Sequence, residues 1–171
     1  MNAASIEIEN LTVESGLPET IAALQFSNWG CSTGFSSAAE YEQFLYKAAR
    51  SSHLPTVLVA RRGGRFLGSV NLLVHEMTTH PQLSPWLGQL FVIAEERGQG
   101  VGSELVRACL ARFAELGFVR MHLYTAASTT LPANYAAPGW KTIEEVEYLG
   151  KLRAVMAFDF QASGKSSSRS I

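Results

Sequence analysis

The chain of 171 residues is poor in the features that mark disulfide-rich, nucleic-acid-binding and membrane proteins. It has two cysteines, too few for a disulfide scaffold. Its 14 Lys and Arg against 15 Asp and Glu give a net charge of −1, so no basic surface and no nucleic-acid partner are expected. No window approaches the roughly 18 consecutive apolar residues of a membrane span. The expectation is therefore a soluble cytoplasmic protein with no membrane partner.

Candidate metal ligands and reactive thiols are also scarce. The four histidines, His53, His75, His80 and His122, show neither the paired spacing nor the cysteine neighbours of a zinc site. Cys109 lies on the apolar side of a predicted helix, where a buried thiol is the usual state, and Cys31 is far from it in the sequence. No metal, disulfide or thiol chemistry is predicted.

What the sequence does contain is the apolar content of one globular domain, with 47% hydrophobic and 17% charged residues. The domain is predicted to span residues 1–160, and the Ser-rich residues 161–171 are predicted to form a flexible tail. Apolar periodicity predicts strands at 6–13, 56–60, 66–77, 87–93, 119–125, 140–148 and 152–160, and helices starting near 18, 38, 101 and 132. The order β, α, α, β, β, β, α, β, α, β, β predicts a mixed α/β fold around one sheet.

Several local signals support these boundaries. Ile21, Leu24 and Phe26 are expected to line the apolar face of the first helix, and Ser36 or Ser37 to cap the second. The glycines of Arg61-Arg62-Gly63-Gly64 permit the positive φ of a tight turn between two strands. An antiparallel hairpin is therefore predicted there.

The chemistry is concentrated in the segment Arg97-Gly98-Gln99-Gly100-Val101-Gly102, between a predicted strand and an amphipathic helix. The first turn of a helix has NH groups without intrahelical partners and a positive dipole end, and glycine lets an anion approach the backbone. A phosphate site is one interpretation. A tight turn with no ligand explains the same glycines, and the hexapeptide alone does not separate the two.

Two other phosphate motifs do not fit these residues. A dinucleotide fingerprint that begins at Gly98 needs glycine where Ser103 stands. A Walker-type loop needs Gly-Lys followed by Ser or Thr, but no lysine occurs between Lys47 and Lys141. Binding of ATP or NAD, which would predict thermal stabilisation by those nucleotides, is therefore disfavoured.

The segment resembles the acetyl-CoA signature Q/R-x-x-G-x-G/A of the GNAT acetyltransferases, which Arg97, Gly100 and Gly102 match after a strand. Tyr135 followed by Gly139-Trp140 is similar to the family's Y-x-x-x-G-F/W element. The Leu-Ser-Pro-Trp run that ends at Trp86 is similar to a bacterial subgroup of N-acetyltransferases whose acceptor is unassigned. The likeness covers roughly residues 5–160.

The resemblance implies transfer of an acetyl group from acetyl-CoA to a primary amine, on a small molecule or a peptide, by direct attack in a ternary complex. It implies that the strand after Leu90 and the glycine-rich loop bind the cofactor, through Phe91, Val92, Ile93, Arg97, Gly98, Gln99, Gly100, Val101, Gly102 and Ser103. A backbone NH near Val92 or Ile93 would donate to the developing oxyanion. Family members are often dimers, which leaves a homodimer open.

Tyr135 is the candidate general acid, because a phenol of pKa about 10 can lend a proton to a thiolate without being ionised at neutral pH. Its alternative role is that of a core aromatic. The base is less clear, because many relatives carry a carboxylate where this chain reads Leu87-Gly88-Gln89. Glu76 is the first candidate, followed by His75 or an ordered water, and the solvent-facing end of a strand explains both side chains equally well.

Other residues have two interpretations each. Glu40 and Glu42 could attract a cationic acceptor or simply face solvent from a helix. The arginines Arg61, Arg62 and Arg65 are expected to form a solvated turn, and would meet the 3′-phosphate of coenzyme A only if that turn lay near it. The tryptophans Trp29, Trp86 and Trp140 are expected in the core or at the rim of an acceptor pocket.

A second functional class keeps the fold without catalysis. In that interpretation the domain binds acyl-CoA as a sensor or partner module, and the missing strand carboxylate is its main support. Release of free CoA thiol with a panel of amines would separate the enzyme from the sensor.

Overall fold

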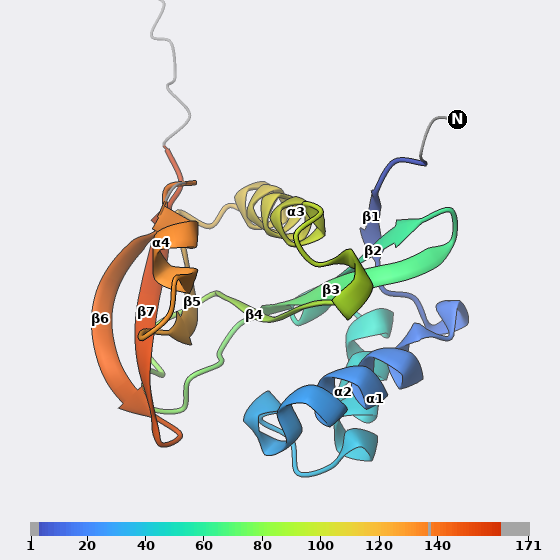
Figure 1. Cartoon of the computed structure of the whole chain (residues 1–171), viewed down its shortest axis with the longest axis horizontal. Helices are drawn as coiled ribbons and strands as arrows, with labels where there is room; N and C mark the ends of the chain where they lie inside the picture. The colour runs from blue at the N-terminus through green and yellow to red at the C-terminus, as the bar shows by residue number, and fades with distance from the viewer. Residues whose placement is uncertain (1–3, 137, 162–171) are drawn as a thin grey trace, which may run out of the picture.

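The computed structural model of the chain describes residues 4–136 and 138–161, and contains one sheet of seven strands (Figure 1). The strand order is β1-β2-β3-β4-β5-β7-β6, antiparallel except for the parallel pair β4 and β5. The strands are β1 (Glu7–Asn10), β2 (Thr56–Arg62), β3 (Arg65–Leu73), β4 (Trp86–Val92), β5 (Arg120–Ala126), β6 (Lys141–Tyr148) and β7 (Lys151–Asp159). The helices are α1 (Leu17–Trp29), α2 (Ala38–Arg50), α3 (Val101–Glu115) and α4 (Leu131–Ala136).

The predicted fold class and element order are confirmed, with one boundary error that matters for function. The strand predicted at 66–77 ends at Leu73, because the chain leaves the sheet there and turns, with the His80 NH donating to the Met77 carbonyl at 3.0 Å. The apolar letters that suggested a longer strand include Met77, which is buried beside the sheet and not in it. His75 and Glu76 therefore lie on a loop.

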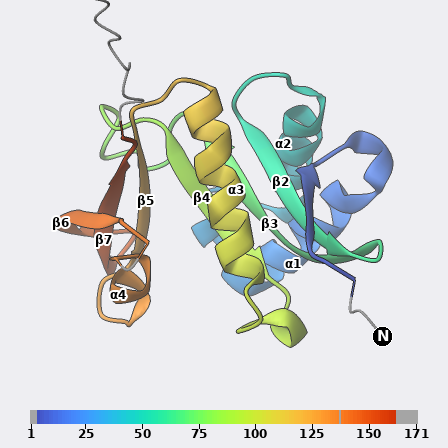
Figure 2. The same ribbon diagram turned by 90° about the horizontal axis from the view of Figure 1, so that it is seen from above.

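Helices cover both faces of the sheet (Figure 2). Helix α3 packs on one face, against β2, β3 and β4, through residues spaced four apart, namely Val101, Leu105, Cys109 and Phe113, all buried. The buried state predicted for the Cys109 thiol is confirmed. Helices α1 and α2 pack on each other and on the opposite face.

The second helix begins with the predicted cap, but the first buries a polar residue. Ser37 Oγ accepts from the Glu40 NH at 3.1 Å and Glu40 Oε2 accepts from the Ser36 NH at 2.8 Å, a reciprocal capping arrangement. In α1 the buried face contains Ile21 and Gln25. The expected residues Leu24 and Phe26 are half-buried, and the sequence did not indicate the buried amide of Gln25, which donates to Ser69 Oγ at 3.0 Å and accepts from the Tyr41 hydroxyl.

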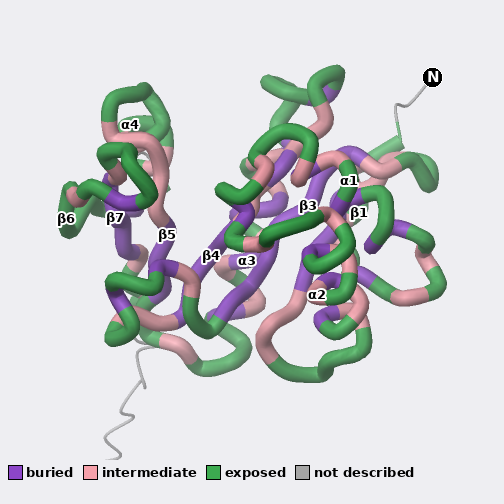
Figure 3. Tube along the Cα trace, turned by 90° about the horizontal axis from the view of Figure 1, so that it is seen from below, coloured by how far each residue is buried: buried purple, intermediate pink, exposed green. Residues whose placement is uncertain are grey.

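Two tight hairpins complete the predicted antiparallel pairs. Gly63 and Gly64, with φ of 56° and 81°, form the two-residue turn between β2 and β3. Leu149 and Gly150, also with positive φ, join β6 to β7. Figure 3 shows the central strands buried and β6, at the edge of the sheet, largely exposed.

The two parallel strands diverge, and this divergence creates the site. Strands β4 and β5 share one paired position, Trp86 with His122, and separate beyond it (Figure 1). Strand β4 also bulges, because two residues, Gln89 and Leu90, stand opposite one residue of β3, and Gln89 has a φ of 43°. The middle of the sheet is therefore open on the side of β4 that faces β5.

The predicted tail, apart from Gln161, lies outside the described residues. Among the residues that the structure describes, no helix has the length and apolarity needed to cross a bilayer. The division into a domain at 1–160 and a tail at 161–171 stays a prediction.

Candidate active site

The glycine-rich segment forms the turn that starts α3. Gly98 and Gly100 have φ of 74° and 85°, a conformation that favours glycine, and α3 begins at Val101. No side chain caps this helix start, so the NH groups of its first turn are available to a ligand. The turn has the backbone arrangement of an anion site.

A pocket of about 700 Å³, here called the α3 pocket, opens directly on this turn. Its walls come from β4, the turn, α3 and α4, through Leu90, Val92, Glu96, Arg97, Gly98, Gly100, Gly102, Ser103, Val106, Arg107, Leu110, Leu131, Asn134, Tyr135 and Pro138. Six of the ten cofactor residues predicted from the sequence line it: Val92, Arg97, Gly98, Gly100, Gly102 and Ser103. The other four, Phe91, Ile93, Gln99 and Val101, are outside its wall.

The backbone of β4 offers one free amide of the two predicted. The Ile93 NH donates to the Leu67 carbonyl at 2.9 Å and is therefore occupied. Neighbouring residues alternate in an antiparallel ladder, so the NH of Val92, paired with Gly68, points away from β3 and toward the gap before β5. The approach of β3 and β4 is close here, because a Cβ at Gly68 would lie 2.4 Å from the Phe91 carbonyl oxygen.

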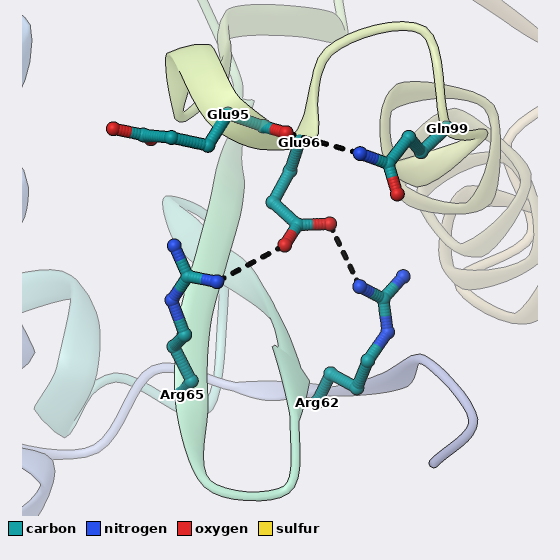
Figure 4. Close-up of polar contacts among 5 residues, drawn as sticks. All are labelled: Arg62, Arg65, Glu95, Glu96 and Gln99. Atoms are coloured by element: carbon teal, nitrogen blue, oxygen red, sulfur yellow. Dashed lines mark hydrogen bonds and ion pairs between the residues drawn. The ribbon is translucent and has the colours of Figure 1, made fainter. Parts of the chain in front are cut away.

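The β2–β3 turn is tied to the glycine-rich segment by a cluster of charges (Figure 4). Glu96, in the short 3-10 turn Ala94–Glu96, accepts from Arg62 at 2.7 Å and from Arg65 at 3.2 Å, while only 8% of its side chain is exposed. Arg61 pairs instead with Glu9 at 3.1 Å. Arg65 is exposed, as expected for a solvated turn, but Arg62 is half-buried, because the hairpin reaches the loop before α3 and finds a buried carboxylate there.

A second pocket, of about 360 Å³, lies in the gap between β4 and β5 and is here called the sheet pocket. Its wall is mostly apolar and is formed by Trp29, Ser32, Glu76, Leu87, Gly88, Gln89, Leu90, Leu123, Tyr124, Thr125, Ala126, Leu131, Tyr135 and Arg153. Three residues, Leu90, Leu131 and Tyr135, line both pockets. The two pockets therefore meet, with Tyr135 of α4 at their junction.

Glu76, the first candidate for the base, is a wall residue of the sheet pocket, and the alternative of a solvent-facing strand end does not describe it. The carboxylate has room beside β4 because residue 88 is glycine, and a Cβ there would lie 2.8 Å from Glu76 Oε1. Oε1 accepts from Gln89 Nε2 at 3.3 Å, and Oε2 is buried with no hydrogen-bond partner among the described residues. Burial raises the pKa of Glu76 to about 8, because the charged form loses its hydration.

A chain of buried hydrogen bonds runs from α1 through α2 and β3 to Glu76. Tyr41 donates to Gln25 Oε1 at 2.5 Å, and Asn71 Nδ2 donates to the Tyr41 hydroxyl at 3.1 Å and to Gln89 Oε1 at 3.0 Å. With its carbonyl fixed by Asn71, the amide of Gln89 presents its NH₂ group to Glu76 and to the Thr33 carbonyl. Gln89 of β4 is thus the contact of Glu76, and it is supported in turn by groups from α1, α2 and β3.

Tyr135 has the environment of an un-ionised phenol. Desolvation by burial raises its pKa above the ordinary value, and its ring packs edge-on against Trp140 with centroids 6.1 Å apart. The backbone NH of Trp140 donates to the Tyr135 carbonyl at 3.3 Å, which connects the end of α4 to the start of β6. The tyrosine and the Gly139-Trp140 pair predicted as one element are therefore in contact.

The remaining candidates divide between pocket, surface and core. Trp29 lines the sheet pocket, while Trp86 and Trp140 are buried in the core. His75 is exposed, and Glu40 is part of the cap of α2. Neither His75, Glu40 nor Glu42 lines either pocket.

The sequence interpretation missed Arg153, Glu96 and the buried chain that supports Glu76. The sequence feature that could have indicated them is a single charged or amide residue inside an apolar strand, such as Arg153 in β7 and Asn71 in β3. Such a residue is costly to bury unless it has a partner or a ligand.

The site combines an uncapped helix start, which suits an anionic ligand, with a second pocket between two diverging strands. The family model described as Acetyltransferase (GNAT) family matches residues 21–137. The chain belongs to this family and is an N-acetyltransferase of the GNAT type, which confirms the resemblance stated above.

Solved structures of acetyltransferases share the fold. An aminoglycoside 6′-N-acetyltransferase complexed with coenzyme A is 17% identical, with a TM-score of 0.67 over 90% of this chain and 96% of that one. The PaiA N-acetyltransferase of Thermoplasma acidophilum in complex with coenzyme A is 20% identical, with a TM-score of 0.67 over 91% and 99%. The IAA acetyltransferase of Bacillus cereus is 19% identical, with a TM-score of 0.61 over 91% and 100%. No curated protein sequence matches the chain significantly.

Proposed function

We propose that the chain transfers the acetyl group of acetyl-CoA to a primary amine by direct attack in a ternary complex. The observation that carries this proposal is that Tyr135 lines both pockets, between the helix start suited to a diphosphate and the wall that contains Glu76. Two similar structures hold coenzyme A, which agrees with acetyl-CoA as the co-substrate. The diphosphate would lie on the first turn of α3 and the thioester at the junction of the pockets.

The α3 pocket suits the charge of the cofactor. Arg97 lines it and forms no ion pair among the described residues, while Arg107 is paired with Glu104, and the carboxylate of the wall, Glu96, is neutralised by Arg62 and Arg65. The NH groups at the start of α3 add the positive end of a helix dipole. A cofactor with several phosphate groups would therefore be attracted to this wall.

Each step of the transfer has a candidate group in the wall of one of the two pockets. The amine nitrogen attacks the thioester carbonyl carbon, the Val92 NH donates to the oxygen that becomes negative, and the carbon–sulfur bond breaks. Glu76 accepts the proton from nitrogen, and Tyr135 donates its proton to the leaving thiolate.

The alternative of a non-catalytic acyl-CoA sensor loses its main support. That support was the missing strand carboxylate, and Glu76 supplies a carboxylate beside Gln89.

Direct attack is favoured over an acyl-enzyme by the positions of the thiols. Cys31 is exposed, Cys109 is in the core under α3, and neither lines a pocket. Initial rates measured with both substrates varied should give intersecting lines in double-reciprocal plots. Parallel lines, the pattern of a covalent acyl-enzyme, would contradict the proposal.

Replacement of Tyr135 by Phe tests the assignment of the general acid. The variant keeps the ring that packs on Trp140 and loses only the hydroxyl, so kcat should fall by about 100-fold or more while the KM for acetyl-CoA changes less than about twofold. Tyr46→Phe, on the outer side of α2 over Arg50, is the matched control and should leave both constants unchanged. Unchanged turnover in Tyr135→Phe would remove Tyr135 from the mechanism.

A further inference from the structure

Arg153 places a positive charge in the wall of the sheet pocket. It lies on β7 opposite Ala126 of β5, and its guanidinium carbon is 5.5 Å from the centroid of the Tyr124 ring. Its Nε is buried and has no hydrogen-bond partner within the described part of the chain. A half-buried guanidinium with an unsatisfied donor is costly, so a ligand that accepts hydrogen bonds from the part of this group that lines the pocket would be bound favourably.

No carboxylate of the described residues forms an ion pair with Arg153, whereas Arg61, Arg62 and Arg65 are each paired. Glu76 is the one acidic residue in the described wall of the sheet pocket, and its Oε1 is bonded to Gln89 instead. Burial raises the pKa of Glu76 to about 8, so the carboxyl is mostly uncharged at neutral pH. The charge of the pocket wall is therefore positive.

We propose that the acceptor carries an anionic group, such as a carboxylate, in addition to its amine, and that Arg153 binds this group while the amine lies toward Glu76 and Tyr135. This inference rests on the proposed function and specifies its acceptor. Arginine suits the role because its planar fork can donate two parallel hydrogen bonds to a carboxylate. The cation–π contact with the Tyr124 ring favours the position of the guanidinium at the pocket wall.

The size and the apolar wall of the sheet pocket further limit which molecules can act as the acceptor. A volume of about 360 Å³ is near the lower end of small-molecule sites, so a free molecule about the size of an amino acid fits better than a folded protein. Trp29, Leu87, Leu123 and Tyr124 would contact an apolar body between the two polar ends. Polycationic amines are disfavoured, because their second charge would meet Arg153.

Matched acceptors test the inference in a CoA-thiol release assay with acetyl-CoA. Each pair shares one amine and differs by a carboxylate: phenylalanine with phenethylamine, and 6-aminohexanoate with hexylamine, with spermidine as the polycation. In at least one pair the carboxylated member should have the higher kcat/KM, by about tenfold or more, as expected for a charge-assisted hydrogen bond. A preference for the plain amines or for spermidine would overturn the inference and leave the acetyltransferase function intact.

Variants of Arg153 separate the anion site from general effects on the pocket. In Arg153→Met the ratio of kcat/KM within the responsive pair should fall to about one, and in Arg153→Lys, which keeps the charge without the fork, it should be intermediate. Lys151→Met, a loss of charge on the same strand outside both pockets, is the matched control and should keep the wild-type ratio. A ratio unchanged in Arg153→Met would exclude Arg153 as the anchor.

Binding without turnover distinguishes failure of the anion site from failure of the proposed function. Calorimetry with 3-phenylpropionate and its neutral amide, in the presence of CoA, should detect at least tenfold tighter binding of the carboxylate, lost in Arg153→Met. If this difference is found although no amine is acetylated, the anion site stands and the function fails. Equal binding of the acid and the amide would overturn the anion site whatever the amines do.

Discussion

At the scale of the residue, Glu76 gains its chemistry from the groups that surround it. Gly88 leaves space for its carboxylate, Gln89 donates to Oε1, and Oε2 has no partner in the described part of the chain. A carboxylate in such a place is a stronger base than an exposed one, because its protonated form is favoured by burial. The pKa of about 8 lies close to the pH at which a general base works best.

The pH dependence of Glu76→Gln tests this base. Only the ionised carboxylate accepts a proton, so the ratio of wild-type to variant kcat/KM, measured with one acceptor so that the ionisation of the amine cancels, should rise with pH and level off above about 8. A ratio of wild-type to variant kcat/KM that is independent of pH would contradict the role of Glu76 as base.

The stability of the fold should respond to pH in the opposite sense. The raised pKa of Glu76 stabilises the fold fully below the unfolded value of 4.5, and this contribution is lost as the pH rises through 8. Glu76→Gln should therefore gain stability relative to wild type at pH 9.

At the scale of the element, the start of α3 combines two kinds of glycine. Gly98 and Gly100 have positive φ and are required by the backbone, whereas Gly102 lies in the helix, where an added Cβ would meet only Val92 Cγ2 at 3.7 Å. The fold alone therefore does not require glycine at 102. Close approach of a ligand to the backbone does give a reason for it.

Gly102→Ala tests whether glycine at this position serves the fold or the approach of a ligand. The free energy of unfolding should stay unchanged or rise by up to about 1 kcal/mol, since alanine favours a helix, while the affinity for CoA should fall by about tenfold or more. Urea unfolding and calorimetry on the same preparation measure both quantities. Unchanged affinity would mean that the ligand does not approach the backbone at this residue.

The loop before α3 depends on the ion pairs of Glu96. Loss of this carboxylate leaves Arg62, half-buried, without a partner, so Glu96→Gln should lower the free energy of unfolding by about 1–3 kcal/mol. The matched control is Glu104→Gln, which breaks an exposed pair with Arg107 on α3 and should cost less than about 0.5 kcal/mol. Equal effects of the two substitutions in urea would contradict a structural role for the Glu96 cluster.

At the scale of the whole molecule, the elements and the glycine-rich turn could be predicted because their signals are local. Periodicity over a few residues identified the strands and α3, and Gly98 to Gly102 stand together in the sequence. The sheet pocket could not be predicted in the same way. The polar contacts behind its wall join residues far apart, with sequence separations of 44 for Gln25 and Ser69 and 18 for Asn71 and Gln89, and the contacts of Gln89 depend on the bulge in β4.

The chain of contacts also explains why Glu76 was misplaced. Its neighbours in the sequence, His75 and Met77, suggested the alternation of a strand, while its actual environment comes from β4 and, through Gln89, from β3 and α2. Arg153 is a similar case, since one arginine in an apolar strand has no local feature that indicates a pocket. Both side chains face the gap that the divergence of β4 and β5 opens.

The central claim is that amides at the start of α3 bind the diphosphate of coenzyme A and thereby place its thioester beside Tyr135. The most direct measurement is calorimetric titration of the protein with CoA and with pantetheine, which shares the thiol arm and lacks both the diphosphate and the 3′-phosphoadenosine that it carries. One CoA should bind per chain, and pantetheine should bind at least about 100-fold more weakly, because several charge-assisted hydrogen bonds are lost. Equal affinity for the two compounds, or no association with CoA at millimolar concentration, would contradict the account.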